Sequence, residues 1–197
     1  MKNEEAYVTA TRESDWKKIC ELSELTFDRF GTKKELKRLP EFIEDNEIVF
    51  GFASGIIGQS GESNTFDFGT NTWLVVLTSE RFLFLDHAMF TSSIDSQSVR
   101  LSKIQGVSAA QGWMLGKIMV DIGNRQISID NCMKGDVKKL ADIANRLLRE
   151  KEELSADQPG SSQAPLEKIE KLAELHSKGI LSDEEFTSAK TKLISEL

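Results

Sequence analysis

Cysteine and histidine are scarce in this sequence, which has only two residues of each type. Cys20 and Cys132 lie far apart with no Cys-x-x-Cys spacing, and His87 and His176 stand in different parts of the chain. Because zinc sites need several Cys, His or carboxylate ligands at close spacing, we expect no metal site and no cofactor. Two unpaired thiols are typical of a reducing compartment, so we expect a cytoplasmic protein.

Long apolar runs and clusters of positive charge are also missing. No run approaches the ~18 apolar residues of a membrane-spanning helix, and we expect no signal peptide or anchor at the start of the chain. The net charge is −7, to which residues 1–46, 47–150 and 151–197 contribute −2, −1 and −4. Because binding to nucleic acid needs a local basic excess, we expect no nucleic-acid partner.

The sequence patterns of common catalytic sites are absent as well. The glycine-rich stretch Gly51–Gly61 suggests a phosphate-binding loop, but such a loop needs a lysine, and none occurs between Lys37 and Lys103. The chain has no G-x-S-x-G elbow either, and Asp183–Glu185 is typical of the acidic first turn of a helix. We therefore expect no catalytic residues and no enzyme, and we interpret the glycines as part of a strand and loop.

Short segments rich in β-branched and aromatic residues fill residues 47–131. They read EIVFGFA, TWLVVLT, RFLFLDH, KIMVDIG and QISID, with weaker candidates in SIDSQSVRL and IQGVSAA. Ser79-Glu80 and Gly123–Arg125 separate neighbouring segments and predict two hairpins. An amphipathic helix follows, with Asp136 as its N-cap. The pattern predicts an α+β fold, a small antiparallel barrel or sandwich closed by a helix.

The remaining segments flank this barrel. Residues 1–46 are predicted to be helical, with one apolar face from Trp16 to Phe30 and a second short helix over Lys34–Asp45. Since such short helices are marginal on their own, we expect them to pack on the barrel domain, residues 47–150. Residues 151–165 hold two of the three prolines and are typical of a flexible linker. Residues 166–197 are predicted to form a separate helical hairpin.

Three motifs within the barrel segment point to a family. They are L-T-x-x-R at Leu77, Thr78 and Arg81, L-x-K-I at 101–104 and G-K-I at 116–118. With the strands and the closing helix, they resemble the bacterial pleckstrin-homology-like (PH-like) domain over residues 36–150. The resemblance implies a PH-like barrel with a recognition surface.

The same resemblance bears on lipid binding. Eukaryotic PH domains that bind phosphoinositides use basic residues in the loop between the first two strands. The corresponding stretch here, Ala53–Asn71, contains no Lys or Arg and includes Glu62 and Asp67. We therefore expect no electrostatic binding of lipid headgroups.

The C-terminal residues 166–197 read as two amphipathic helices around one turn. Gly179 can end the first helix in a left-handed conformation, and Ser182 with Glu185 is predicted to form a capping box for the second. Units below about 40 residues rarely bury a core of their own, so this hairpin must dock on something. The stretch Leu175–Phe186 resembles the short C-terminal domain (SHOCT), which implies assembly or partner contact. The predicted contact residues are Ile169, Leu172, Leu175, Gly179, Ile180, Leu181, Phe186 and Leu193.

Two apolar clusters of the barrel are further candidates for contact. Trp113, Met114 and Leu115 stand in a turn, where packing within the domain is the common outcome and a partner-binding hot spot is the alternative. Ile56 and Ile57 lie between glycines, where core or strand-end packing competes with an apolar contact to a membrane.

These observations favour a non-enzymatic interaction or scaffold protein. The barrel would carry the recognition surface, and the hairpin would mediate self-association or docking on a protein partner, which makes a homo-oligomer the expected state. One alternative is a peripheral membrane protein that uses the apolar barrel loops. Another is a phage or mobile-element regulator of a host protein, because the family that the tail resembles includes such proteins.

Overall fold

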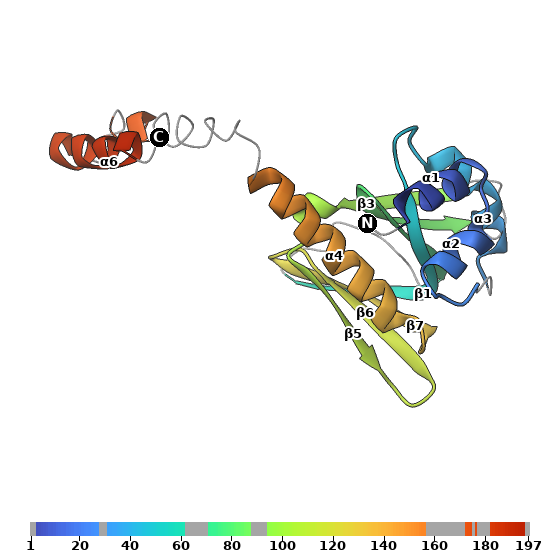
Figure 1. Ribbon diagram of the computed structural model, residues 1–197. Helices are drawn as coiled ribbons and strands as arrows, with labels where there is room; N and C mark the ends of the chain where they lie inside the picture. Colours follow the sequence, from blue (N-terminus) through green and yellow to red (C-terminus); the bar gives the residue numbers. More distant parts are fainter. Residues whose placement is uncertain are drawn as a thin grey trace. The chain divides into compact units, whose positions relative to one another are not determined.

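The computed structural model describes residues 3–27, 31–61, 71–87, 94–156, 172–174, 176 and 182–195. It divides into two compact units, Met1–Arg149 and Glu150–Leu197, and Figure 1 shows the ribbon of the chain. The first unit holds the sheet and the helices that cover it.

The first unit is built on one seven-stranded sheet in the order β4-β3-β2-β1-β7-β6-β5. All neighbouring strands pair antiparallel. The strands are β1 (Val49–Gly61), β2 (Thr72–Thr78), β3 (Arg81–His87), β4 (Ile94–Arg100), β5 (Gly106–Gln111), β6 (Leu115–Asp121) and β7 (Arg125–Met133). The predicted α+β fold and both predicted hairpins are confirmed, and β2 and β3 have the predicted bounds.

Strand β1 is longer than the sequence suggests and joins the two halves of the sheet. Its first part pairs with β2 and its last part, from Ile56 onward, pairs with β7. Glycine permits this crossing, because a Cβ at Gly55 would lie 2.7 Å from the carbonyl oxygen of Asp130. The expectation that a loop begins at Ala53 is therefore wrong: residues up to Gly61 are strand.

Three short α-helices and a 3-10 turn precede the sheet: α1 (Glu4–Arg12), α2 (Trp16–Leu22), α3 (Lys33–Arg38) and η1 (Leu39–Phe42). The apolar pattern does not reveal the turn that separates α1 from α2, where Ser14 takes a positive φ of 55°. Asp15 then caps α2 by accepting a hydrogen bond from the Lys18 N–H at 3.0 Å. Phe30, predicted to end the apolar face, lies outside the described residues.

The N-terminal helices pack on one face of β1. The Tyr7 and Phe27 rings meet Phe50 and Phe52 edge to face, with centroids 5.0 and 6.0 Å apart. The Trp16 indole N–H donates to the Leu36 carbonyl at 3.2 Å, which ties α2 to α3. Because helices cover this face and the core covers the other, residues 73–78 of β2 and 82–86 of β3 are all buried. Strands buried on both faces read as continuous apolar runs, which explains TWLVVLT and RFLFLDH.

Helix α4 (Val137–Ala156) lies across the other face of the sheet (Figure 1). Val137 packs where Gly116 of β6 leaves space, since a Cβ at Gly116 would lie 2.7 Å from the Val137 side chain. The carboxylate of Asp136, at the N-cap position, accepts the Thr26 N–H at 2.9 Å. The helix continues to Ala156 and so includes the first residues of the segment predicted as a linker, since Glu and Leu favour helix there.

Asn145 of α4 binds the edge strand β5. Its side chain accepts the Val107 N–H at 3.0 Å and donates to the Val107 carbonyl at 2.6 Å. The two bonds take the place of those that a neighbouring strand would make at Val107. Helix α4 therefore both covers the core and pairs backbone groups at the edge of the sheet.

The L-T-x-x-R motif forms a buried clasp with Glu47. The Thr78 hydroxyl donates to Glu47 Oε1 at 2.6 Å, and it accepts the backbone N–H groups of Glu80 and Arg81 in the tight turn. Arg81 donates to both oxygens of Glu47 at 2.9 Å and to the Phe42 carbonyl at 2.9 Å. The Glu47 side chain is 1% exposed and that of Arg81 18%. The motif residues therefore hold the chain entering β1 against the β2–β3 turn.

The clasp determines the charge state of Glu47. Burial raises the pKa of this carboxyl, but the hydrogen bonds from Arg81 and Thr78 outweigh burial, so the pKa lies below its ordinary value of 4.5. A carboxyl with a lowered pKa in the folded state stabilises the fold above its unfolded pKa. That contribution is lost as the pH falls through the lowered pKa of the folded state.

Replacing Asn145 by leucine will lower the free energy of unfolding by about 1–3 kcal/mol, because the Val107 N–H and carbonyl lose their partner. Urea denaturation followed by circular dichroism measures the change. Asn145→Asp is a second variant: it keeps an acceptor for the Val107 N–H but places a charged oxygen against the Val107 carbonyl, so it will also be destabilising. Equal stability of the Asn145→Leu variant and the unmodified protein would contradict the proposed pairing at the strand edge.

Replacing Arg81 by methionine will lower the free energy of unfolding by about 3 kcal/mol, because the buried carboxylate of Glu47 loses its cationic partner. Arg38→Met is the matched control: its ion pair with Glu41 is 2.6 Å long but exposed, so a much smaller loss of stability is expected. Urea denaturation at a series of pH values will also show the stability of the unmodified protein falling as the pH drops below the ordinary pKa of 4.5 toward the lowered pKa of Glu47. This loss will be smaller in Glu47→Gln, and equal effects of the two arginine variants would argue against the clasp.

Candidate functional site

The exposed apolar side chains gather at one end of the β5–β6–β7 half of the sheet. Trp113 is 91% exposed, Met114 71%, Leu115 45% and Met133 43%. Of the large apolar side chains that are exposed in the described residues, all but Leu154 belong to this group. Together with Ile56 these four residues form what we call the apolar hairpin surface.

The local structure explains why these side chains point outward. Leu115 of β6 pairs with Met133 of β7, and the next pair, Gly116 and Cys132, is buried. Because successive side chains of a strand point to opposite faces, Leu115 and Met133 lie on the outer face while their neighbours face the core. Figure 1 shows the turn between β5 and β6 projecting from the strands around it, and this turn holds Trp113 and Met114.

Hydrogen bonds hold the projecting turn in place. The Gly112 N–H donates to the Leu115 carbonyl at 2.9 Å. The Gln111 side-chain amide donates to the Lys134 carbonyl at 2.9 Å, and the Lys134 ammonium donates to the Trp113 carbonyl at 3.2 Å. The exposed aromatic residue thus stands on an anchored turn.

A pocket adjoins the turn on the outer face. It has a volume of about 320 Å³ and is lined by Ser54, Gly55, Ile56, Thr72, Leu115, Asn131 and Met133. Three of these residues belong to the apolar hairpin surface, so the pocket and the projecting turn form one continuous region. Ser54 is buried and its hydroxyl is paired with that of Thr32 at 2.7 Å.

Positive charge borders this region although the chain as a whole is acidic. Lys117 forms an ion pair with Asp130 at 2.8 Å. In the part of the chain that the structure describes, no carboxylate lies within 4.0 Å of the Lys134 ammonium. The region therefore combines apolar contact area, a hollow and an uncompensated cation.

The predicted barrel contacts separate into two groups. Trp113, Met114 and Leu115 are exposed, so packing within the domain, one of the two outcomes left open for them, is wrong, and their contact with a partner stays a prediction. The prediction of Ile57 as a contact residue is wrong, because its side chain is buried in β1 and only 4% exposed. Ile56 points to the outer face and lines the pocket. A membrane contact through Ile56 and Ile57 together is therefore excluded, since adjacent residues of a strand face opposite sides.

The C-terminal unit contains α6 (Asp183–Ser195). The predicted capping box is confirmed: the Ser182 N–H donates to Glu185 Oε2 at 3.0 Å, and the Glu185 N–H donates to Ser182 Oγ at 3.3 Å. The bonds from Ser182 lower the pKa of the Glu185 carboxyl. Leu172 and Phe186 are half-buried. Of the other predicted contact residues, Ile169, Leu175, Gly179, Ile180 and Leu181 lie outside the described residues, as does the side chain of Leu193.

One contact within the C-terminal unit is not predicted by the sequence. The His176 ring stacks on Phe186 with centroids 4.7 Å apart, and its Nε2 lies 2.6 Å from Asp183 Oδ1. The sequence pattern places His176 near a helix end and indicates no further role for it. The one sequence feature that could have indicated this contact is the predicted hairpin, which brings His176 opposite Asp183 and Phe186 at the start of the second helix.

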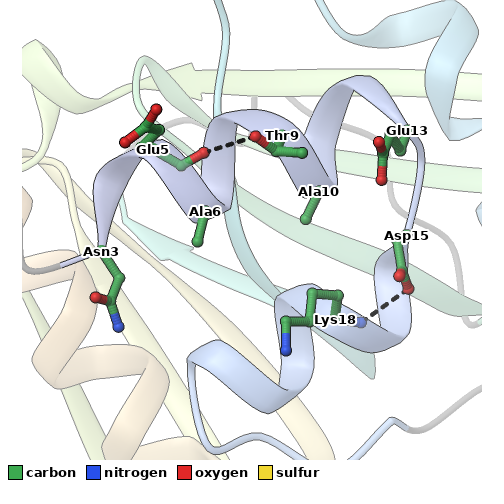
Figure 2. Close-up of a pocket in the computed structure, with 8 residues that line it drawn as sticks. All are labelled: Asn3, Glu5, Ala6, Thr9, Ala10, Glu13, Asp15 and Lys18. Atoms are coloured by element: carbon green, nitrogen blue, oxygen red, sulfur yellow. Dashed lines mark hydrogen bonds between the residues drawn. The ribbon is translucent and has the colours of Figure 1, made fainter.

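A second hollow lies between α1 and α2. It has a volume of about 610 Å³, and Figure 2 shows the eight residues that line it: Asn3, Glu5, Ala6, Thr9, Ala10, Glu13, Asp15 and Lys18. Its polar groups serve the helices themselves. Thr9 donates to the Glu5 carbonyl at 3.0 Å, and Asp15 caps α2. We therefore do not assign a ligand to this hollow.

Both thiols of the chain lie in the interior. Burial, with the nearby Asp136 carboxylate as a smaller cause, raises the pKa of the Cys20 thiol to about 12, and Cys132 is also buried. No group of three His, Cys, Asp or Glu side chains in the described segments could hold a metal ion. No helix of these segments is long and apolar enough to cross a membrane.

Several solved structures are similar to this chain in fold alone. The PH domain of USP37 is 16% identical with a TM-score of 0.38, over 50% of this chain and 97% of that domain. The N-terminal PH domain of Vps36 is 17% identical with a TM-score of 0.40, over 55% and 83%. A DUF1696 family protein with a PH domain from Shewanella loihica PV-4 is 13% identical with a TM-score of 0.36, over 60% and 90%. No curated protein matches the chain.

Two family models match the chain in succession. The model of the bacterial PH domain matches residues 43–146, and that of the short C-terminal domain matches residues 167–194. The first match spans more than half of the chain and contains Glu47, Thr78 and Arg81 of the clasp, the projecting turn and the first half of α4. The protein therefore belongs to the bacterial PH domain family, and its PH domain is followed by a short C-terminal domain.

Proposed function

We propose that this protein is a non-enzymatic interaction protein that binds a protein partner through the apolar hairpin surface. The observation that carries the proposal is the concentration of exposed Trp113, Met114, Leu115 and Met133 on one anchored hairpin pair. Monomeric proteins rarely expose contiguous apolar area without using it. Aromatic side chains at the centre of such areas supply much of the binding energy.

The assignment as a non-enzyme rests on the chemistry of the described residues. The thiols are buried, and the buried ion pair of Glu47 and Arg81 serves to hold the fold together. The PH and short C-terminal domain families are also typically non-catalytic. A binding role uses the surface that the fold leaves exposed and needs no further chemistry.

The C-terminal hairpin adds a second contact in this proposal, for self-association or docking. Its second helix carries a capping box and a half-buried Phe186. The capping residues fix where this helix begins. A unit of this size buries too little apolar area to be stable alone. Association with another copy or with a partner would cover that area.

Replacing Trp113 and Met114 together by serine will remove about 2 kcal/mol or more of binding free energy to the partner, because both side chains are exposed anchors. Affinity purification of the tagged full chain from its native host, quantified by mass spectrometry, measures the loss. Leu154→Ser is the matched control, since Leu154 is 67% exposed and lies outside the apolar hairpin surface. Identical sets of co-purified proteins for the double variant and the unmodified chain would refute the proposed surface.

Removing residues 157–197 will convert an oligomer into a monomer if the tail mediates self-association. The cut leaves α4 complete, and size-exclusion chromatography with light scattering compares the truncated and full chains. Two monomers of the expected masses would show that the tail does not self-associate. The remaining role for it would then be docking on another protein.

A further inference from the structure

The pocket beside the projecting turn restricts what the apolar hairpin surface can bind. Its volume of about 320 Å³ is at the lower end of the range for small-molecule sites, about 300–1,000 Å³. Ile56, Leu115 and Met133 give it apolar walls, while Ser54, Thr72 and Asn131 add polar groups. Such a hollow suits one large apolar side chain whose backbone reaches the polar edge.

The apolar area continues beyond the pocket. Trp113 and Met114, adjacent in sequence to the pocket residue Leu115, are the two most exposed large apolar side chains of the described residues. A small molecule inside the pocket would leave them in water. The occupant that covers both parts is therefore an extended or helical segment with several apolar side chains.

The positive charge at the edge of the surface favours a partner segment that carries negative charge. Lys134 is held at the turn by its bond to the Trp113 carbonyl, and no carboxylate among the described residues neutralises it. Lys117 stands on the same strand as Leu115 and has Asp130 as its partner. A cation at the edge of an apolar contact area favours a carboxylate on the partner, which forms a charge-assisted hydrogen bond.

We propose that the apolar hairpin surface binds an acidic amphipathic segment of a partner protein, with one large apolar side chain in the pocket and a carboxylate on Lys134. This inference rests on the proposed function and specifies the partner's chemistry. The remaining apolar side chains of the segment cover Trp113 and Met114. The exposed Asn131, with a positive φ of 63° at the pocket edge, offers its side-chain amide to the segment's backbone.

A bilayer fits this surface less well than a protein segment does. A lipid surface is flat on this scale and would leave the hollow and its polar groups uncovered. Anionic lipids would also meet a chain of net charge −7, for which electrostatic attraction is unfavourable. Shape and charge therefore both favour a protein segment.

A random peptide library displayed on phage, selected against the full chain, tests the proposed chemistry and needs no identified partner. Selection is followed by counter-selection against the Trp113→Ser/Met114→Ser double variant. The expected result is enrichment of peptides in which Phe, Trp or Leu stands within one helical turn of Asp or Glu. The double variant will change the melting temperature by less than about 2 °C, because the exposed side chains contribute little to stability.

A synthetic peptide of the enriched sequence then tests the role of Lys134 by fluorescence anisotropy. The double variant will bind about tenfold or more weakly, which corresponds to about 1.4 kcal/mol. Lys134→Gln will bind about threefold more weakly, and neutralising the peptide's acidic residue will produce the same loss without adding to that of Lys134→Gln. Lys103→Gln is the matched control, because Lys103 is exposed and precedes the opposite end of β5.

Each contrary result has a distinct meaning. Enriched peptides that depend on Trp113 and Met114 but lack acidic residues would overturn this inference and leave the proposed function standing. Absence of any such peptide would overturn the inference, and the purification experiment above would decide the proposed function separately. Sedimentation with phosphatidylcholine–phosphatidylglycerol vesicles that is lost in the double variant would overturn both. Dimerisation lost in that variant would identify a second copy as the occupant and also overturn the inference.

Discussion

The first unit, Met1–Arg149, depends on the close approach of three distant parts of the chain at Gly51. A Cβ there would lie 2.6 Å from the Leu25 side chain and 3.0 Å from that of Leu140, so glycine lets the segment after α2 and helix α4 meet on β1. Thr26, which follows Leu25, also donates two hydrogen bonds to Asp136, the residue before α4. The N-terminal helices therefore belong to the same packed unit as the sheet, although the family match begins only at residue 43.

The residues that mark the family and the residues that we assign to binding are different ones. Thr78 and Arg81 are engaged by Glu47 in a buried clasp, where their hydrogen bonds are already made. Trp113 and Met114 contribute little to the packing of the domain and are exposed. Under the proposed function, stability and recognition are carried by separate parts of the sheet, so the proposed binding surface can vary without loss of the fold.

The sequence predicted most of the fold because the strands are bounded by turn residues and the helices by caps. The β2–β3 hairpin and the capping box of Ser182 with Glu185 follow from local patterns alone. The turn at Ser14 and the full length of β1 did not, because a positive φ and a strand crossing two half-sheets are imposed by packing partners distant in sequence. The turn at Trp113 was recognised as apolar, but its exposure could not be predicted, since packing and binding leave the same sequence pattern.

By itself, the sequence determined the order of the modules, the absence of a basic excess and the lack of a recognisable catalytic motif, because composition and local spacing decide these properties. Only the tertiary structure decided that Ile57 faces the core while Ile56 lines a pocket, and that Leu115 and Met133 stand together on the outer face. Strand register places residues from β1, β6 and β7 side by side. No local pattern in a single sequence specifies which residues that register will bring together.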